Sequence, residues 1–374
     1  MKIAVNTRLL LKDRLEGIGW FTCESLKRIV RNHPEHTFYF LFDRKYNEQF
    51  IFAENVIPVE LFPPARHPYL WYIYFEYAIP RALRKIQPDL FLSTDGWLSL
   101  HTNVPQVDVI HDLNFEHTAD YIETKYQNFY TRFFPQYARK AARIATVSEF
   151  SKNDIHRFYG IPEEYIDVVY NGSNDVYKPL SAQEQTRVRE SVSGGRPYFL
   201  FVSAIHKRKN LANILRAFER YKQQTAADTQ FVVVGARAGK QDDLDEVLQN
   251  MRFSDDVHFM GRLSADSLAE VMASALALVY ATLFEGFGIP IVEAFNAETA
   301  VITSNVTSMP EVAGNAALLV DPYSVEEIAA AMTKLATNET LRQELIQKGR
   351  QQRNKFSWDL TAQRLWNCMM KAIE

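Results

Sequence analysis

The chain is 374 residues long, which exceeds the size of an ordinary single hydrophobic core, so two domains are expected. Its 42 basic and 45 acidic residues leave a formal net charge of −3, which gives no support for non-specific nucleic-acid binding. The two cysteines, Cys23 and Cys368, fit neither a metal-ligand spacing nor a disulfide-rich secreted protein, so we expect a cytoplasmic protein.

Short apolar runs alternate with amphipathic segments in the first half of the chain. Strands are predicted at 2–6, 37–42, 89–92, 106–110 and 143–147. Between them, apolar residues recur three and four apart, which predicts helices at 18–32, 69–86 and 124–141. Strands and helices that alternate in this way are typical of a parallel sheet covered by helices.

The alternation stops at a polar segment and then begins again. Residues 176–197 end in Ser193-Gly194-Gly195-Arg196-Pro197 and are predicted to be a linker. Beyond it, strands are predicted at 198–203, 230–234, 257–260, 276–280, 300–303 and 317–320. Helices are predicted at 210–223, 241–251, 264–275, 290–297 and 325–336, the last with a capping box formed by Ser324 and Glu327. An amphipathic segment at 358–374 closes the chain.

The two series of elements predict two doubly wound, Rossmann-like α/β domains, 1–175 and 198–357. In sheets of this kind, ligands bind beyond the carboxyl ends of the strands. Two such edges that face each other form a cleft, and we expect the active site there.

The segment Glu285-Gly-Phe-Gly-Ile-Pro-Ile-Val-Glu293 is the most informative in the chain. Its glycines let the backbone approach a ligand closely, and Pro290 suits the first turn of a helix. The N-terminus of that helix offers N–H groups and positive potential to a phosphate. Glu285 would then accept hydrogen bonds from sugar hydroxyls, and Glu293 from a ribose diol. Two carboxylates at this spacing are by themselves more often ordinary surface residues, and the Gly-Phe-Gly-Ile-Pro interior is what favours a site.

This segment resembles the donor-site signature of family 4 of the retaining glycosyltransferases, whose fold is called GT-B. Other stretches resemble family motifs in the same order, over nearly the whole chain. They are Gly17-Ile18-Gly19, Val109-Ile110-His111-Asp112-Leu113, Val147-Ser148-Glu149-Phe150-Ser151, Tyr170-Asn171-Gly172, Phe201-Val202-Ser203, Lys207-Arg208-Lys209-Asn210, Phe259-Met260-Gly261-Arg262-Leu263, Ser308-Met309-Pro310-Glu311-Val312-Ala313-Gly314 and Phe356-Ser357-Trp358. The resemblance implies that the helix at 358–374 packs back on the first domain.

The resemblance also implies roles for the matching residues. Lys209 would bind the donor diphosphate and stabilise the charge that grows as it departs. The family often has a second cation five residues earlier, where this chain has Ala204, and Arg208 would act in its place. A solvated basic loop is the plainer interpretation of this triplet. The implied catalytic set is His111, Glu285 and Lys209, and the implied donor-binding set is Gly17, Gly19, Ser203, Arg208, Lys209, Gly261, Leu263, Phe287, Gly288, Ile289 and Glu293.

His111 follows a predicted strand at its carboxyl end. A histidine in that place is usually structural, whereas the resemblance puts it beside the transferred sugar. Asp112 is expected to anchor the loop by bonds from its side chain to the backbone. The full Gly-x-Gly-x-x-Gly pattern of dinucleotide-binding enzymes fails because Thr22 stands at its sixth position.

No pair of aspartates is placed for a metal ion, since Asp242, Asp243 and Asp245 fall on a predicted surface helix. The resemblance implies a hexosyltransferase that requires no metal or other cofactor. It would act on a nucleotide-sugar donor and on a saccharide or lipid-linked saccharide acceptor. The motifs look most like those of bacterial mannosyltransferases of surface-polysaccharide synthesis, so GDP-mannose is the first donor expected and UDP-hexoses the next.

Two rival classes stay open from the sequence. A GT-B epimerase would turn over the donor without an acceptor. A non-catalytic sugar-nucleotide-binding protein would bind the nucleotide and turn over nothing. A phosphorylase would need a pyridoxal-binding lysine, which the sequence does not obviously offer.

Residues 66–85 combine many aromatic side chains with Arg66, Arg81, Arg84 and Lys85. One interpretation is a helix buried in the first domain. The other is a surface that meets an anionic membrane, with aromatic rings at the interface and cations near the headgroups. No apolar run reaches the roughly 18 residues of a spanning helix, so the association expected is at most peripheral, at the cytoplasmic face of the inner membrane.

Overall fold

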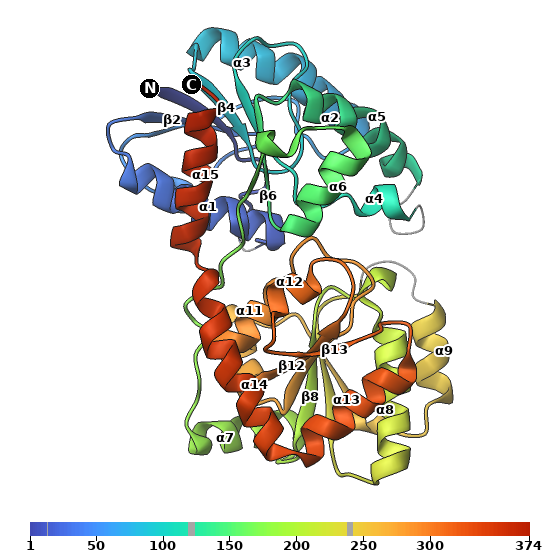
Figure 1. Cartoon of the computed structure of the whole chain (residues 1–374). Coiled ribbons are helices and arrows are strands. Elements are labelled where there is room, and N and C mark those ends of the chain that lie inside the picture. Colours follow the sequence, from blue (N-terminus) through green and yellow to red (C-terminus); the bar gives the residue numbers. More distant parts are fainter. Residues whose placement is uncertain (13, 119–123, 238–241) are drawn as a thin grey trace. The chain divides into compact units, whose positions relative to one another are not determined.

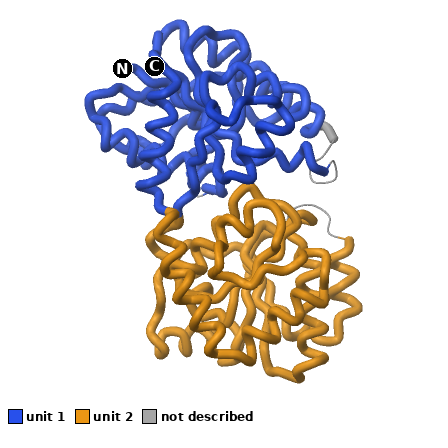
Figure 2. Tube along the Cα trace, viewed as in Figure 1, with its two compact units in different colours: residues 1–172, 357–374 blue, residues 173–356 orange. Residues whose placement is uncertain are grey.

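The computed structural model describes residues 1–12, 14–118, 124–237 and 242–374 (Figure 1). The chain divides into two compact units (Figure 2). The first unit comprises Met1–Gly172 together with Ser357–Glu374, and the second comprises Ser173–Phe356. Each unit has its own parallel sheet covered by helices, as the alternation of strands and helices predicts.

The first unit is built on a seven-stranded parallel sheet with the order β3-β2-β1-β4-β5-β6-β7. Its strands are β1 (Lys2–Asn6), β2 (Thr37–Phe42), β3 (Val56–Glu60), β4 (Leu90–Ser93), β5 (Gln106–Val109), β6 (Arg143–Thr146) and β7 (Ile166–Val168). The order reverses between β1 and β4, so the carboxyl ends of these two strands flank a topological switch point. Ligands of doubly wound sheets bind at such a point.

Helices cover both faces of this sheet. They are α1 (Gly17–Asn32), α2 (Pro68–Ile73), α3 (Ile79–Ile86), α4 (Asn114–His117), α5 (Thr124–Lys140), α6 (Glu149–Tyr159) and α15 (Trp358–Lys371). The last helix, α15, packs against α1, where Arg28 Nε donates to Asp359 over 2.6 Å. Gly172 lies against its start so closely that a Cβ would stand 2.3 Å from the Trp358 nitrogen. The segment at 358–374 therefore completes the first unit, as expected.

The helix predicted at 69–86 is interrupted in the middle. A π-helical turn, Tyr74–Ala78, lies between α2 and α3, and the Ile79 N–H donates to Tyr74 O. Pro80 has no N–H to donate, which removes one hydrogen bond of a regular α-helix at this point. The wider turn places Glu76 in the interior, where its carboxylate accepts from the Leu100 N–H at 3.0 Å and lies 2.6 Å from Nδ1 of His101.

The second unit is built on a six-stranded parallel sheet with the order β10-β9-β8-β11-β12-β13. Its strands are β8 (Tyr198–Val202), β9 (Gln230–Val234), β10 (Val257–Gly261), β11 (Ala277–Tyr280), β12 (Ala300–Ser304) and β13 (Leu318–Val320). Its helices are α7 (Ala182–Ser193), α8 (Leu211–Thr225), α9 (Asp242–Asn250), α10 (Ala265–Ala273), α11 (Ile289–Asn296), α12 (Met309–Ala313), α13 (Val325–Thr337) and α14 (Glu339–Gln352). The four inner strands, β8, β9, β11 and β12, are fully buried and mostly apolar, as expected for a sheet covered on both faces, whereas the edge strands β10 and β13 are partly exposed.

The segment 176–197, expected to be a linker, is largely helical and belongs to the second unit. Ser181 and Glu184 form a reciprocal capping box that begins α7, and Gly194 ends the helix in a left-handed conformation. At α13 only half of the predicted box forms. Ser324 accepts from the Glu327 N–H, but the Glu327 carboxylate accepts from the Asp321 N–H instead.

Among the helices that the structure describes, none has both the length and the hydropathy to cross a membrane.

Candidate active site

The turn between β11 and α11 contains the sequence motif that begins at Glu285. Gly288 directly precedes α11 with a φ of +99°, a conformation that favours glycine. Pro290 lies in the first turn of the helix, where its missing N–H would have no partner in any case. The Ser308 hydroxyl donates to Glu285 O at 2.9 Å and Phe287 O at 3.2 Å. These contacts fix the loop and leave the amino end of α11 at the carboxyl edge of the sheet.

Glu285 lies at the centre of a charged cluster, although its side chain is almost fully buried. Its carboxylate forms an ion pair with Lys209, lies 3.1 Å from the Arg208 guanidinium, and accepts from the Tyr280 hydroxyl at 2.9 Å. Burial by itself would raise the pKa of Glu285. The charges of Lys209 and Arg208 outweigh burial and hold its pKa below the usual value, so Glu285 is ionised at neutral pH.

The cations come from a short 3-10 turn, Lys207–Lys209, that follows β8. Arg208 donates to Phe284 O at 2.6 Å, and its own carbonyl accepts from the Leu283 N–H at 3.0 Å. Asn210 ends the turn with a φ of +63° and donates to Ala281 O at 2.9 Å and Pro322 O at 2.7 Å. The basic turn and the Glu285 loop are thus bound to each other through both backbone and side chains.

Glu293 lies one turn into α11 and is half buried. Its partner is Tyr177, which the sequence motifs do not predict as a site residue. The Tyr177 hydroxyl donates to its carboxylate. Burial raises the pKa of Glu293 to about 7, and the bond from Tyr177 offsets part of that rise. At neutral pH, Glu293 therefore exchanges between a neutral acid and a carboxylate, unlike Glu285.

The other predicted donor-site residues of this unit lie at the same edge of the sheet. Ser203 directly follows β8, and its N–H donates to Val234 O at 3.0 Å. Gly261 ends β10 with a φ of +65°, and its carbonyl accepts from the Gly235 N–H at 2.8 Å. Leu263 follows on the partly exposed loop that leads to α10. Since β8, β9 and β10 are neighbours, these residues share one rim.

In the first unit, His111 follows β5 and bonds to the residue that follows β4. Its Nε2 lies 2.9 Å from Thr94 O, so this nitrogen carries the proton and Nδ1 keeps its lone pair. Burial lowers the pKa of His111, and the bond to Thr94 opposes that shift only in part, so the ring is neutral at neutral pH. The predicted loop anchor is present at Asp112, whose Oδ1 accepts from the Asn114 N–H at 3.0 Å.

The two glycines of the Gly17-Ile18-Gly19 turn have different surroundings. A Cβ at Gly17 would meet nothing within 4 Å, whereas a Cβ at Gly19 would lie 3.1 Å from Leu9 O. Gly17 leaves open space at the start of α1, which allows the close approach expected for a ligand. Gly19 instead makes room for the chain's own loop after β1.

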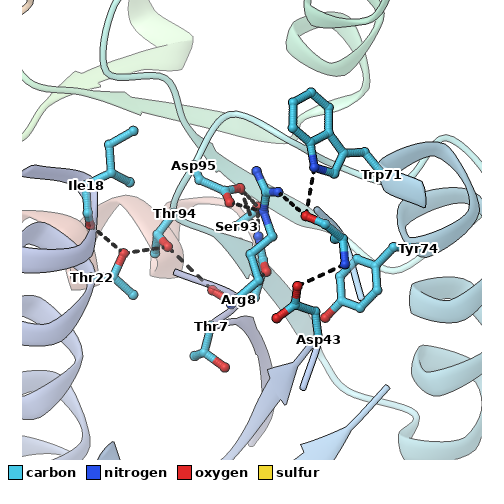
Figure 3. Close-up of polar contacts among 12 residues, drawn as sticks. Thr7, Arg8, Ile18, Thr22, Asp43, Trp71, Tyr74, Ser93, Thr94 and Asp95 are labelled. Carbon is cyan, nitrogen blue, oxygen red and sulfur yellow. Dashed lines mark hydrogen bonds and ion pairs between the residues drawn. The ribbon is translucent and has the colours of Figure 1, made fainter. Parts of the chain in front are cut away.

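The switch point contains a buried ion pair, Arg8–Asp95, that the sequence motifs do not predict. Arg8 Nε donates to Asp95 Oδ2 at 2.5 Å (Figure 3). Asn6 Nδ2 donates to the other oxygen at 2.9 Å. The Arg8 guanidinium also lies 5.5–6.0 Å from the ring centres of Trp71, Phe75 and Trp97. Thr94, which directly precedes Asp95, bonds to Thr22 of α1 and to His111. The network therefore links the carboxyl ends of β1, β4 and β5 to one another.

Comparison with known proteins accounts for both units. Residues 16–175 match the family described as Glycosyltransferase Family 4, and residues 182–352 match Glycosyl transferases group 1. The chain belongs to the glycosyltransferases. Between them the two matches cover every strand of both sheets except β1, and every residue of the charged cluster.

Similar proteins support the same family and fold. The O-antigen chain mannosyltransferase B of Escherichia coli is 27% identical over 71% of this chain and 68% of its own length. The O-antigen chain mannosyltransferase RfbU of Salmonella typhimurium is 29% identical over 68% of this chain and 67% of its own length. The structure of Anabaena Alr3699/HepE in complex with UDP and glucose superposes with a TM-score of 0.76 at 15% identity, over 98% of each chain. That likeness shows the GT-B fold of this glycosyltransferase.

Proposed function

We propose that this glycosyltransferase moves a mannosyl group from a nucleoside-diphosphate sugar to a saccharide or lipid-linked saccharide in surface-polysaccharide synthesis. A nucleoside-diphosphate donor is inferred from the cluster of Lys209, Arg208 and Glu285 beside the amino end of α11. Two cations and a helix N-terminus at the carboxyl edge of a parallel sheet are suited to a diphosphate. The names of the two O-antigen relatives support mannose as the sugar.

In the proposed reaction, the glycosidic bond to the diphosphate breaks and the acceptor hydroxyl forms the new bond on the same face of the sugar. A diphosphate oxygen takes the acceptor proton. Lys209 and Arg208 stabilise the negative charge on the departing diphosphate, and Glu285 holds both cations in place before the donor arrives. Retention of configuration rests on the resemblance to family 4.

The remaining residues take positions around the donor in this proposal. Glu293 accepts hydrogen bonds from the ribose hydroxyls, which replace the hydrogen bond from Tyr177 to its carboxylate. Gly261 and Leu263 contact the base through their backbone, and Gly288 with Ile289 offers N–H groups to phosphate. His111 accepts a hydrogen bond at Nδ1 from a hydroxyl of the transferred sugar, because its other nitrogen is held by Thr94. Guanosine is the base we propose first and uridine second.

A melting-temperature screen tests the donor site directly. Wild-type protein and the Lys209→Ala variant are heated with GDP-, UDP-, ADP- and dTDP-sugars, since a ligand that binds the folded state raises its melting temperature. A rise with GDP-mannose that is lost in the variant supports the proposal. If no nucleotide sugar raises the melting temperature of the wild type, the donor-site assignment is wrong.

Product analysis separates transfer from its rivals. Incubation of GDP-mannose with and without a lipid-linked saccharide distinguishes three outcomes. Acceptor-dependent release of GDP supports the transferase, isomerised donor without acceptor would indicate an epimerase, and binding with no turnover would indicate a non-catalytic protein.

We also propose that the surface around α2 meets an anionic membrane. Phe62, Tyr69 and Tyr77 are 84%, 71% and 62% exposed, although Tyr74 and Phe75 of the same segment are buried. The cations Arg66, Arg81, Arg84 and Lys85 are all exposed. Exposed aromatic rings with nearby cations suit the interface of an anionic bilayer. Sedimentation with anionic vesicles at low salt tests this, and a protein that stays in the supernatant would contradict it.

A further inference from the structure

The short loop between α1 and β2 gathers two histidines and a carboxylate. His33 directly follows α1, and Glu35 and His36 come just before β2. One potential ligand atom from each residue lies within 4.8 Å of the other two, and among the residues that the structure describes no other such group of His, Cys, Asp and Glu occurs. The loop is at the amino edge of the sheet, opposite the carboxyl edge that carries His111 and Thr94.

The distances between these atoms suit a tetrahedral ion. Glu35 Oε1 lies 3.7 Å from His33 Nδ1 and 3.3 Å from His36 Nε2. Zinc bonds of about 2.0–2.2 Å to nitrogen and oxygen require ligand atoms roughly 3.3–3.5 Å apart in a tetrahedron. Two of the three pairs are thus close to this spacing, the third lies within 4.8 Å, and water would take the fourth position.

The surroundings hold both imidazoles in place. The Trp366 ring of α15 stacks on both, with ring centres 3.7 Å from His33 and 5.2 Å from His36. Asn55 Nδ2 lies 3.2 Å from His33 O and 3.0 Å from His36 O, which fixes the loop backbone at both histidines. The Met1 amino group lies 3.3 Å from Nδ1 of His36. When Nε2 binds an ion, Nδ1 carries the ring proton, so this amino group must turn away or accept from Nδ1.

The helix dipole of α1 favours a cation in this loop, whereas the charge of the Met1 amino group opposes one. The carboxyl end of α1 carries the negative end of the helix dipole.

We propose that His33, Glu35 and His36 form a binding site for a divalent zinc-class ion that braces α1, β2 and α15 of the first unit. Two imidazoles and one carboxylate with an open fourth position form a ligand set that zinc accepts. Within the first unit, the site lies at the edge of the sheet opposite His111, so it stabilises the fold and takes no part in sugar transfer.

Zinc titration of the untagged full-length chain, freed of metal by a chelator, tests the site. We expect one Zn²⁺ per chain, and affinity at least about tenfold weaker in His33→Ala, His36→Ala and Glu35→Gln. His67→Ala is the matched control, because it removes an exposed histidine outside the cluster and should leave the affinity unchanged. Glu35→Gln keeps the shape of an exposed side chain and reports on the site even if a histidine variant folds poorly.

Two further measurements distinguish a specific zinc site from adventitious binding of zinc to the surface. Co²⁺ bound to the wild type should give the intense visible absorption of tetrahedral coordination, and Zn²⁺ should raise the melting temperature of the wild type but not of Glu35→Gln. Zinc affinity that is equal in the wild type and all three variants would overturn the proposal. A weak, octahedral Co²⁺ spectrum would also overturn it.

Discussion

The unusual pKa of Glu293 predicts a pH dependence of nucleotide binding. Its pKa is raised from 4.5 to about 7 by burial. If ribose hydroxyls donate to this carboxylate, only the ionised form binds well. About 10% of chains carry that form at pH 6 and about 90% at pH 8, so the affinity for GDP should rise about ninefold, or about 1.3 kcal/mol, across this range.

Calorimetric titration with GDP at pH 6 and pH 8 measures this rise, with Glu293→Gln as the control. The amide cannot ionise, so the variant retains only the pH dependence that comes from the phosphates of GDP and from other groups. Tyr177→Phe removes the hydrogen bond that lowers the pKa of Glu293, so it should move the midpoint to higher pH. If wild type and Glu293→Gln show the same ratio of affinities between pH 6 and pH 8, the reasoning is refuted.

The same shift predicts how stability depends on pH. Between pH 4.5 and about 7, the folded protein holds a proton on Glu293 that the unfolded chain has lost, so its contribution to stability falls as pH rises through this window. The loss amounts to at most about 3 kcal/mol above pH 7. Between pH 4 and pH 8, the unfolding free energy of Glu293→Gln should therefore rise relative to that of the wild type.

Three other predictions rest on named contacts, and a fourth rests on the expectation that catalysis needs no metal. Lys209→Met should lower kcat by about 10²–10³-fold while its exposed neighbour variant Lys207→Met changes it far less, and equal losses would contradict the role of Lys209. Gly288→Ala should lower the melting temperature more than Gly261→Ala, because both glycines have positive φ but only a Cβ at Gly288 would crowd a neighbour, 2.7 Å from Met309 Cε. Arg8→Met should destabilise the protein by about 3–5 kcal/mol in urea unfolding, because it leaves Asp95 buried without its cation. Adding Asp95→Leu to this variant should recover part of the loss. If the destabilisations of the two single variants simply add in the double variant, the ion pair is contradicted. Turnover should survive EDTA, and a loss restored by Mg²⁺ or Mn²⁺ would show a catalytic metal.

Elements with a strong local pattern could be predicted from sequence almost to the residue. The strands at 2–6 and 37–42 have the predicted bounds because each is a short apolar run between polar residues. β3 was missed, since it is an edge strand interrupted by Pro58, and an edge position is where a sheet accepts proline. α7 and α14 were missed because their sequences are polar on most sides and lack a clear apolar stripe.

The residues of the candidate site also differ in whether a local sequence pattern can predict them. Glu285, Gly288 and Glu293 lie within one turn and one helix, so a local motif is enough to find them. The partners that determine their chemistry are distant in sequence. Tyr177 alters the pKa of Glu293 from a segment expected to be a linker, and no spacing rule connects the two residues. Arg8 and Asp95 meet only because β1 and β4 are neighbours in the sheet.

The two charged clusters differ in a way that bears on their roles. Arg8 lies among three aromatic rings, donates to the Ala65 carbonyl and pairs with a carboxylate that Asn6 also holds, so moving its guanidinium would break several contacts at once. Lys209 is a single ammonium on a flexible stem, and its partner Glu285 is also held by Arg208 and Tyr280. An arriving diphosphate can therefore draw Lys209 away while Glu285 keeps two of its partners. The first cluster is suited to hold the switch point rigid, and the second to exchange one anion for another.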